Sequence, residues 1–385
     1  MKYYIISGEA SGDLHGANLM RALLQRQPDA QIRFWGGDRM AEAAAASPSA
    51  VQVRHIRDLA FMGIVEVVSH LREISGNLKF CKQDILDFHP DTVVLIDYPG
   101  FNLKIAKFTH SNGFRNVYYI SPQIWAWKKG RIRPMRRDLD KLCYILPSER
   151  AFYARNNFPQ AVYVGHPLLD EVERYRLQHN DIAARQDNAE SQTAAERQKP
   201  LIALLPGSRK QELRRMLPAM ARLAQRHPEF HFVVAAMTLI GREFYESCLP
   251  KDVTNVELRF DSTYQILSSA FAAVVCSGTA TLETALFRVP QVVCYQCNRL
   301  SAFIARILIG KSIKYISLVN LIADSPIVTE LIQSDFNDGV LDGEFRKITV
   351  DESNRSRIFE GYDRLIGILE GPGASERTAD IIIQN

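Results

Sequence analysis

The residues best suited to bind an anion lie in Leu201–Arg215, which has the sequence LIALLPGSRKQELRR. Leu201–Leu205 is predicted to be a buried strand, followed by a turn of small residues, Pro206–Ser208, and by a helix for which Pro218 is a favourable first residue. The free amides and the positive dipole end of a helix N-terminus, together with the guanidinium of Arg209, suit a phosphate. An ordinary strand-to-helix turn with a solvated arginine has the same pattern, so this stretch alone leaves both interpretations open.

A second turn of this kind follows the strand predicted over Ala272–Cys276. Ser277, Gly278 and Thr279 open the next helix, whose first amides are therefore free to hold an anion. Glu283 lies one turn into that helix, where a carboxylate could accept hydrogen bonds from sugar hydroxyls. The alternative is that Glu283 only stabilises the first turn of the helix.

Asp97 directly follows a predicted buried strand, Thr92–Ile96, and begins the sequence DYPGFN. Open α/β sheets bind ligands beyond the carboxyl ends of their strands, so Asp97 is a candidate general base. Aspartate is also a good N-terminal helix cap, and the residues alone do not separate the two roles.

Three glycines separate the first predicted strand, Tyr3–Ser7, from a helix predicted over Ala17–Gln25. Gly8, Gly12 and Gly16 do not have the spacing of the dinucleotide-binding fingerprint, and no acidic residue follows where it would bind a ribose. They still predict a glycine-rich loop at the end of the first strand, where an open α/β sheet binds ligands.

Two tryptophans, Trp125 and Trp127, precede a strongly basic segment. Its cations, against the acidic residues Asp138 and Asp140, are Lys128, Lys129, Arg131, Arg133, Arg136, Arg137 and Lys141. This pattern is expected where a protein meets anionic headgroups or a phosphorylated amphiphile. A solvated basic helix is the alternative, and nucleic-acid binding is a weaker third.

The segment Leu59–Leu71, LAFMGIVEVVSHL, carries a large apolar surface with few charges. It is either a core helix or an exposed face that meets lipid or a hydrophobic substrate. No window of the sequence approaches the length needed to span a bilayer, and no signal peptide is expected.

The composition is that of a globular protein with more than one domain. The 385 residues exceed a single compact core, and the fractions of hydrophobic and charged residues, 46% and 23%, are ordinary. A net charge of +4 is too small to indicate nucleic-acid binding. The six cysteines lie mostly in apolar segments, which indicates reduced thiols in a cytoplasmic protein. Cys294 and Cys297 form a lone C-x-x-C, for which core packing is favoured over a zinc site.

Predicted strands and helices alternate along both halves, which indicates an α/β fold with two doubly wound, Rossmann-like domains facing across a cleft. The N-terminal domain is predicted over residues 1–172, a polar connector over 173–200, and the C-terminal domain over 201–350. Residues 351–385 are predicted to form helices that pack back on the first domain or on a partner chain. Two anion-binding turns in one half and a carboxylate in the other favour a transferase or isomerase that acts on a nucleotide-linked group.

Seven motifs occur in the order found in lipid-A-disaccharide synthases, a family of glycosyltransferases with the B-type double-Rossmann architecture. They are SGEASGDLHG at residues 7–16, DYPGFN at 97–102, SPQIWAWKKGR at 121–131, GHP at 165–167, LLPGSRKQE at 204–212, SGTATLE at 277–283 and SLVNLIA at 317–323. Each motif alone is weak, whereas seven in one order are specific, so the chain resembles this family over nearly its whole length. The long polar connector before residue 200 departs from the family's pattern.

The resemblance implies an inverting transfer of 2,3-diacylglucosamine from UDP-2,3-diacylglucosamine to 2,3-diacylglucosamine 1-phosphate (lipid X), giving the β-1,6-linked lipid A disaccharide 1-phosphate and UDP. Asp97 is then the base that activates the acceptor hydroxyl. The residues implied for donor binding are Ser208, Arg209, Ser277, Gly278, Thr279, Glu283 and Asn320. The residues implied for the acceptor or a membrane surface are Gly12, Asp13, Trp125, Trp127, Arg131, Arg133, Arg136 and Arg137.

The resemblance also implies no cofactor and no obligatory metal, because such enzymes stabilise the leaving diphosphate with helix N-termini and cations. It implies peripheral attachment to the inner face of the cytoplasmic membrane, with Leu59–Leu71 as a surface for acyl chains, and no nucleic-acid partner. It leaves a homodimer open. The alternatives are a UDP-N-acetylglucosamine 2-epimerase, which shares the architecture, and a non-catalytic protein that binds a nucleotide sugar or a lipid.

Overall fold

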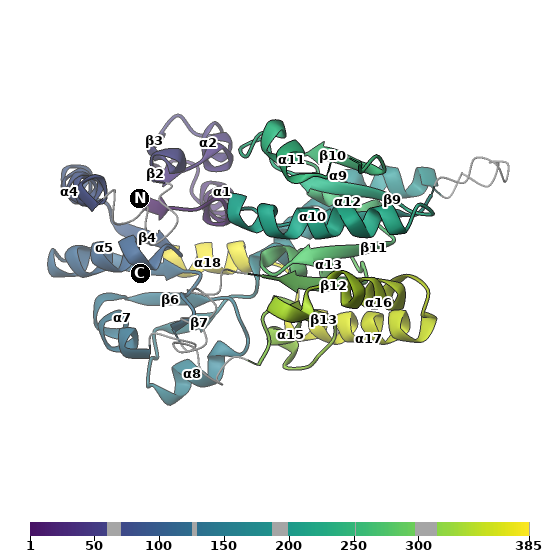
Figure 1. The fold of residues 1–385 in the computed structure, drawn as a ribbon. Helices are drawn as coiled ribbons and strands as arrows, with labels where there is room; N and C mark the ends of the chain where they lie inside the picture. The colour runs from purple at the N-terminus through teal and green to yellow at the C-terminus, as the bar shows by residue number, and fades with distance from the viewer. Residues whose placement is uncertain (60–70, 125–128, 187–198, 251, 297–313, 385) are drawn as a thin grey trace. The chain divides into compact units, whose positions relative to one another are not determined.

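The structure is a computed structural model that describes residues 1–59, 71–124, 129–186, 199–250, 252–296 and 314–384 (Figure 1). The chain divides into two compact units, Met1–Asp170 with Pro372–Asn385, and Glu171–Gly371. Each unit is built around a parallel β-sheet whose strands alternate with helices along the chain. The prediction of an α/β protein with two doubly wound, Rossmann-like domains is confirmed.

The N-terminal unit contains a seven-stranded sheet with the order β3-β2-β1-β4-β5-β6-β7, and all its strand pairs are parallel. The strands are β1 (Lys2–Ser7), β2 (Gln31–Gly36), β3 (Ala50–His55), β4 (Thr92–Ile96), β5 (Arg115–Tyr119), β6 (Lys141–Tyr144) and β7 (Ala161–Tyr163). Every residue of β4 is buried, because helices cover both faces of the central strands. The chain leaves β1 towards β2 and leaves β4 towards β5, so the strand order reverses between β1 and β4.

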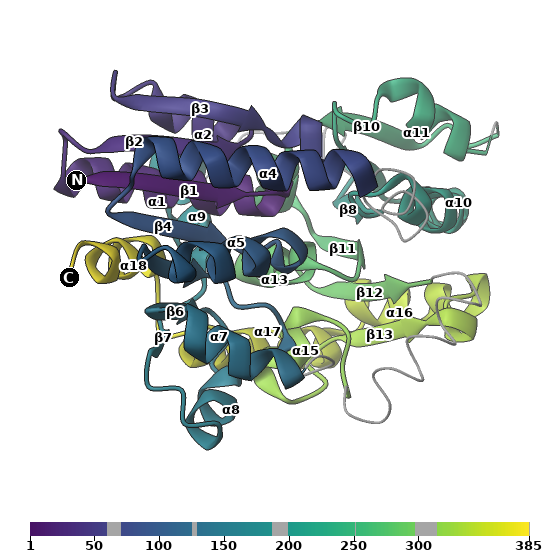
Figure 2. The same ribbon diagram turned by 90° about the vertical axis from the view of Figure 1, so that its left-hand side faces the viewer.

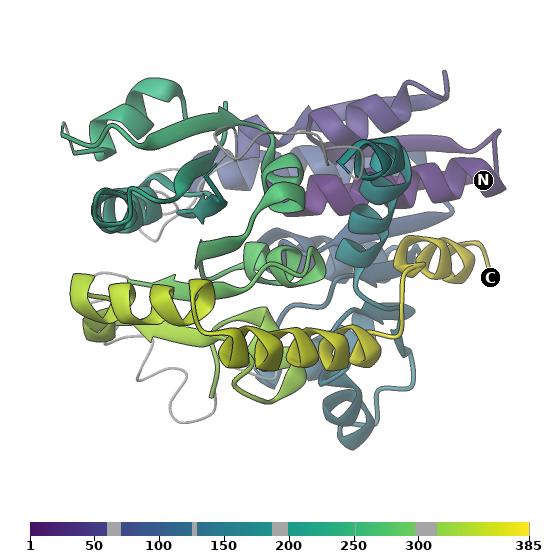
Figure 3. The same ribbon diagram turned by 90° about the vertical axis from the view of Figure 1, so that its right-hand side faces the viewer.

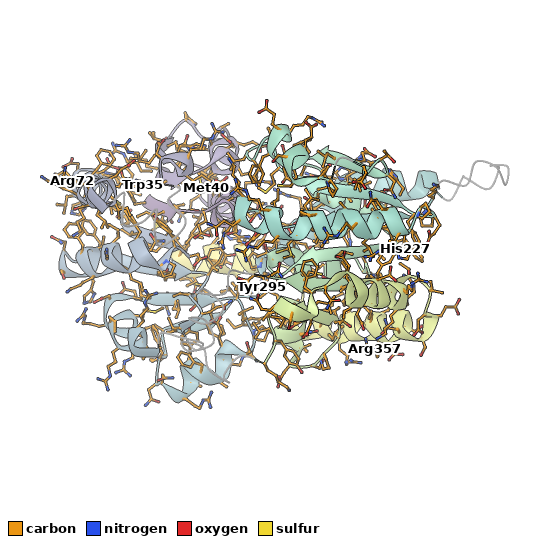
Figure 4. All side chains as sticks on the ribbon, in the orientation of Figure 1. Trp35, Met40, Arg72, His227, Tyr295 and Arg357 are labelled. Carbon is orange, nitrogen blue, oxygen red and sulfur yellow. The ribbon has the colours of Figure 1, made fainter. Side chains whose placement is uncertain are left out.

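Helices cover both faces of this sheet: Figure 2 shows α4, α5 and α7 in front of it, and Figure 3, from the opposite side, shows α1 (purple) and α18 (yellow). The helices of this unit are α1 (Ala10–Arg26), α2 (Asp38–Ala44), η1 (Ile56–Leu59), α4 (Leu71–Phe88), α5 (Pro99–Ser111), η2 (Lys129–Arg131), α7 (Ile132–Asp138), α8 (Glu149–Arg155) and α18 (Ala374–Ile383). Helix α9 (Pro167–Gln186) begins in this unit and runs into the C-terminal unit. Trp35, labelled in Figure 4, fixes the core under α4 and α5. Its indole N–H donates to the hydroxyl of Tyr4 at 2.8 Å, and its ring centroid lies 5.5 Å from that of Phe101.

The C-terminal unit contains a six-stranded parallel sheet with the order β10-β9-β8-β11-β12-β13, so its strand order reverses between β8 and β11. The strands are β8 (Leu201–Leu205), β9 (His231–Ala236), β10 (Val256–Phe260), β11 (Ala272–Cys276), β12 (Gln291–Tyr295) and β13 (Thr329–Ile332). The helices are α10 (Lys210–Arg226), α11 (Arg242–Cys248), α12 (Thr263–Ser269), α13 (Thr279–Leu286), α15 (Leu318–Ala323), η4 (Gln333–Asp335), α16 (Asp338–Thr349) and α17 (Glu352–Ile368). His227, labelled in Figure 4, ties α10 to α16, since its buried ring lies 2.8 Å from the carboxylate of Asp342.

The boundary between the units differs from the predicted one. Helix α9 runs through the predicted boundary at residue 172 and into the polar segment expected to be a connector, and the units divide between Asp170 and Glu171. The reason is that Leu168, Leu169 and Val172 give the start of α9 a buried apolar face. The first part of the polar segment that follows is therefore helical, up to Gln186.

The last helix, α18, belongs to the N-terminal unit, whereas α17 belongs to the C-terminal unit. α18 packs against α1, and the guanidinium of Arg26 pairs with the carboxylate of Asp380 at 2.5 Å. The carboxylate of Asp170 accepts a hydrogen bond from the N–H of Gly373 at 2.6 Å, which fixes the entry of the chain into α18. Arg115 of β5 donates to main-chain carbonyls at the other end of this helix.

Candidate functional site

The carboxyl ends of β1 and β4 lie side by side where the strand order of the N-terminal sheet reverses, which is where such folds bind ligands. Asp97 directly follows β4, and Glu9 follows β1 by two residues. Asp97 is partly buried, and burial followed by the charge of Glu9 raises the pKa of its carboxyl from 3.8 to about 7. A carboxyl that titrates near neutral pH is well matched to general base catalysis.

Glu9 is a residue of this site that the sequence reasoning missed. It precedes α1 in extended backbone, and its charge contributes to raising the pKa of Tyr98 as well as that of Asp97. Its position beyond the carboxyl end of a central strand is the same signal that selected Asp97.

The glycines after β1 have a packing role. Gly12 and Gly16 lie inside α1, one turn apart, so the prediction of a glycine loop before the helix is wrong. A Cβ on Gly12 would lie 2.5 Å from Oγ of Ser7, and one on Gly16 would lie 2.5 Å from Sδ of Met40, which Figure 4 labels. Both glycines therefore let α1 approach the end of the sheet closely, and nothing in this packing presents Gly12 to an acceptor.

Asp13 is also structural. Its carboxylate is buried and accepts hydrogen bonds from the N–H groups of Gly37, Arg39 and Met40 at 2.6, 3.1 and 3.1 Å. These amides belong to the start of α2, where unpaired N–H groups attract a carboxylate. Three amides pair with its oxygens, and the prediction that Asp13 contacts the acceptor stays a prediction.

Part of the predicted lipid-facing surface falls outside the described residues, namely Trp125, Trp127 and residues 60–70. Arg131 of η2 lies near the site, since its positive charge opposes the rise that burial causes in the pKa of Tyr118. Tyr118 in turn donates a hydrogen bond to the main-chain carbonyl of Asp97.

The other arginines of the basic segment lie on α7 and are exposed. Arg136 donates to the carbonyl of Asn156 at 3.2 Å, and Arg137 pairs with Asp138 at 2.6 Å. Arg133 is exposed on the same helix. The segment therefore presents a cationic surface on α7, while the carboxylate of Asp138 is buried and pairs with Arg137.

Glu149, the first residue of α8, is a fully buried carboxyl with one oxygen that lacks a hydrogen-bond partner. Burial raises its pKa from 4.5 to about 8, against the effect of a hydrogen bond from the N–H of Leu146. The contribution of this group to stability is thus complete below pH 4.5 and is lost as pH rises through about 8.

We expect Glu149→Gln to remove this dependence on pH. Its free energy of unfolding should match the wild type at pH 4 and exceed it by roughly 4 kcal/mol at pH 8. Urea unfolding at pH 4, 6 and 8 measures the difference, with the exposed Glu376→Gln as control. A variant that kept the wild-type slope between pH 4 and 8 would show that Glu149 ionises as it does in water.

In the C-terminal unit the carboxyl ends of β8 and β11 lie side by side at the second reversal of strand order. The turn after β8 leads into α10, which begins at Lys210 with Arg209 as its N-cap residue. Pro218 lies inside this helix, so the prediction that it begins the helix is wrong. Leu213 and Leu217 continue the buried apolar face, and the residues before Pro218 are good helix formers.

The amides of the turn after β8 are already paired. Oε2 of Glu212 accepts hydrogen bonds from the N–H groups of Ser208 and Arg209 at 3.1 and 3.2 Å. Gly207 has a φ of 106°, and a Cβ there would lie 2.4 Å from the same carboxylate. This corrects the prediction that free amides at this turn hold the anion. The side chain of Arg209 is 59% exposed, with its guanidinium 3.8 Å from the carboxylate of Glu212, so it is the group through which this turn can bind a phosphate.

The turn after β11 has exposed residues at the start of the next helix. Gly278 precedes α13 without a side-chain cap, and both Gly278 and Thr279 are exposed. The hydroxyl of Ser277 donates to the carbonyl of Ile316 at 2.8 Å, so it supports a neighbouring loop. The start of α13 thus lies at an exposed and uncapped helix N-terminus, which suits an anion.

The two turns lie at one edge of the sheet. Burial raises the pKa of the Cys276 thiol at the end of β11, and the charges of Glu212 and Arg209 act on it in opposite directions. Arg209 and the start of α13 therefore both follow the carboxyl ends of adjacent strands. Glu283, one turn into α13, accepts a hydrogen bond from the hydroxyl of Tyr264 at 2.8 Å.

Asn320 is buried, and its side chain is consumed by the fold. The amide exchanges hydrogen bonds with the main chain of Val328 at 3.0 and 2.9 Å and donates to Glu330 at 2.9 Å. These bonds hold the amide within the fold, as is usual for a buried polar group, and the prediction that Asn320 binds the donor stays a prediction. Glu330, which the sequence reasoning missed, also accepts from the N–H groups of Ile316 and Ser317, and so organises the loop beside Ser277.

No group of three or more histidine, cysteine, aspartate or glutamate side chains suited to a metal ion occurs in the part of the chain that the structure describes. Across the same ranges, no helix has the length and apolar character required to cross a membrane.

Comparison with known sequences finds relatives along nearly the whole chain. Residues 3–363 match the family described as lipid-A-disaccharide synthetase. A lipid-A-disaccharide synthase from Syntrophus aciditrophicus is 38% identical over 381 residues, which cover 97% of this chain and 95% of that protein. Another from Chromohalobacter salexigens is 36% identical over 388 aligned positions, which cover 99% and 96% of the two chains.

Comparison with solved structures finds the same architecture at low sequence identity. The UDP-GlcNAc 2-epimerase from Neisseria meningitidis bound to UDP-GlcNAc superposes with a TM-score of 0.67 at 12% identity, over 100% of both chains. A glycotransferase of kitacinnamycin superposes with a TM-score of 0.62 at 14% identity, over 99% of this chain and 98% of that one. At such identities the likeness concerns the fold alone.

Proposed function

Because the chain belongs to the lipid-A-disaccharide synthase family of glycosyltransferases, we propose that it transfers 2,3-diacylglucosamine from UDP-2,3-diacylglucosamine to 2,3-diacylglucosamine 1-phosphate. The products are the β-1,6-linked disaccharide 1-phosphate and UDP. The observation that carries the proposal is the family match over residues 3–363. The carboxyl after β4 and the exposed turn after β11 support the proposal, because such a reaction needs a base and a group that binds the diphosphate.

Asp97 is proposed as the general base. The 6-hydroxyl of the acceptor is a poor nucleophile until a base removes its proton as it attacks the anomeric carbon of the donor. With a pKa of about 7, Asp97 is ionised for much of the time at neutral pH and still holds a proton well once it has taken one. Glu9 supports this role, since its negative charge makes Asp97 more basic.

Arg209 and the first amides of α13 are proposed to bind the diphosphate of the donor. Negative charge develops on UDP as the bond to the sugar breaks, and preorganised donors at that place lower the barrier. Arg209 supplies a planar guanidinium, and Gly278 and Thr279 lie at the exposed start of α13. The reaction needs no further cation in this scheme.

An assay with purified diacylated donor and acceptor tests the proposed function. We expect UDP release and disaccharide formation only when both substrates are present, and no change of rate with EDTA. UDP-N-acetylglucosamine alone is the control for an epimerase, which would convert it to its 2-epimer without any acceptor. Epimer formation without disaccharide would overturn the proposal.

The exposed cations of α7 are proposed to hold the protein on the inner face of the cytoplasmic membrane. Each basic residue near an anionic surface contributes about 1 kcal/mol, so Arg133→Gln with Arg136→Gln should weaken binding to vesicles that contain anionic lipid by about thirtyfold. Co-sedimentation measures this, with Arg242→Gln and Arg357→Gln as the matched pair. Equal binding by the two double variants would exclude α7 as the contact.

Sedimentation equilibrium without lipid distinguishes a monomer of 43.6 kDa from a homodimer.

A further inference from the structure

The peptide that carries Asp97 has an unusual backbone. Asp97 and Tyr98 both have a positive φ, 43° and 49°, although neither is glycine. Such a conformation costs about 1–3 kcal/mol for each residue and persists only where the surroundings impose it. Two successive residues of this kind at the tip of β4 therefore need strong local support.

Two buried side chains supply this support by donating to one carbonyl. Nδ2 of Asn102 lies 2.7 Å from the main-chain oxygen of Asp97, and Oη of Tyr118 lies 2.5 Å from it. Both residues are fully buried, Asn102 on α5 and Tyr118 on β5. The Asp97 carbonyl therefore has both of its lone pairs engaged, from two different elements.

The side-chain amide of Asn102 is paired at its donor end and unpaired at its acceptor end. Its Nδ2 also approaches the carbonyls of Ile96 at 3.1 Å and of Ile6 at 3.4 Å, whereas its Oδ1 is buried without a hydrogen-bond partner. An unpaired buried oxygen destabilises a fold, so the bonds at the donor end must offset this cost. The shortest of them is the bond to the carbonyl of Asp97.

We propose that Asn102 and Tyr118 are positioning residues that hold the Asp97 peptide, and with it the carboxylate, in the orientation that the transfer requires. This inference rests on the proposed role of Asp97 as the base. Neither residue touches substrate in this scheme; both act through the main chain of Asp97.

Loss of either donor lets the peptide turn towards ordinary backbone angles and moves the carboxylate from its place. The charged and titratable groups around it are Glu9 after β1, Tyr98 beside it, Tyr118 on β5 and Arg131 of η2. Burial and the charge of Glu9 keep Asp97 basic, so displacement weakens both effects. The acid limb of the pH profile of kcat then moves to lower pH. A change that only destabilises the fold does not move this limb.

Tyr118→Phe is the main test, because it removes one hydroxyl and keeps the ring. We expect kcat to fall about tenfold with KM little changed, and the acid limb to move down by about one pH unit. Tyr153→Phe is the matched control, since its buried hydroxyl bonds to Ser121 in the same unit. Unchanged kcat and an unchanged limb in Tyr118→Phe would overturn the proposal.

Asn102→Leu is the second test, with Asn116→Leu as its control. Asn116 is also a fully buried amide, and its Nδ2 donates to the carbonyls of Ala106 and Asp138. Both variants should lose thermal stability, but only Asn102→Leu should also lose at least tenfold in kcat below its own melting temperature. Equal kcat in the two folded variants would count against positioning by Asn102.

Asp97→Asn, measured in the same series, separates this proposal from the proposed function. If Asp97→Asn retains wild-type kcat, the assignment of the base fails and positioning has nothing to act on. If Asp97→Asn is inactive while Tyr118→Phe and Asn102→Leu behave like their controls, the base stands and the positioning role is overturned.

Discussion

Asp97→Asn is expected to lower kcat by about 10²- to 10⁴-fold, the range that a positioned general base contributes. Asparagine keeps the size of the side chain and its hydrogen bonds but cannot take a proton. KM for the acceptor should change little, because the lost interaction belongs to the transition state. Steady-state kinetics with both diacylated substrates measures the effect.

Asp91→Asn is the control for this variant. Asp91 precedes β4, at the opposite end of the strand, where its carboxylate accepts a hydrogen bond from the N–H of Lys2. We expect its kcat to equal that of the wild type. Full activity in Asp97→Asn would transfer the role of base to another group at the reversal of strand order, with Glu9 the first to examine.

The same carboxyl sets an expected pH dependence. Since Asp97 has a pKa of about 7 and acts as a base, kcat should fall tenfold for each pH unit below about 7. An ordinary aspartate would place this limb near pH 3.8. Glu9→Gln should move the limb to lower pH, because it removes the second cause of the raised pKa. The residual activity of Asp97→Asn should show no limb near pH 7.

Arg209→Ala is expected to lower kcat/KM for the UDP-linked donor by about 10²- to 10³-fold, as the loss of one preorganised donor at a developing charge does. Arg209→Lys should recover only part of this, because an ammonium lacks the planar fork of a guanidinium. The ratio is measured at saturating acceptor with varied donor.

Arg214→Ala is the matched control for Arg209. Arg214 lies on the same helix with the same charge, but its guanidinium stacks on the ring of Phe244 at 5.2 Å. We expect it to leave kcat/KM within about twofold of the wild type, as distant surface changes do. Equal losses in the two variants would mean that general positive charge, rather than a contact at the turn, assists the donor.

The buried strands could be predicted from the sequence because burial on both faces writes a continuous apolar run. Thr92–Ile96, Leu201–Leu205 and Ala272–Cys276 lie where they were expected. The helix after β1 was misjudged for a physical reason. Gly12 and Gly16 lie inside α1 because neighbouring side chains leave no room for a Cβ at either position. The sequence does not show these tertiary contacts.

The candidate site was predictable only in part, because residue type does not reveal which polar atoms the fold consumes. The side chains of Asp97 and Arg209 can contact a ligand, whereas those of Asp13 and Asn320 form hydrogen bonds with neighbouring main chain. Glu212 shows the same limit from the other side. Its carboxylate accepts from the N–H groups of Ser208 and Arg209, and residue types alone do not show that these amides are paired.

The return of α18 to the N-terminal unit bears on the order in which the chain folds during synthesis. Domains usually fold as they emerge from the ribosome, the first before the second. Here the first unit lacks the partner of Arg26 until Asp380 has been made, so the unit that comes second in the sequence is complete earlier. The C-terminal unit is in effect an insertion in the N-terminal unit. During synthesis, the N-terminal unit is therefore expected to have part of α1 uncovered until α18 has been made.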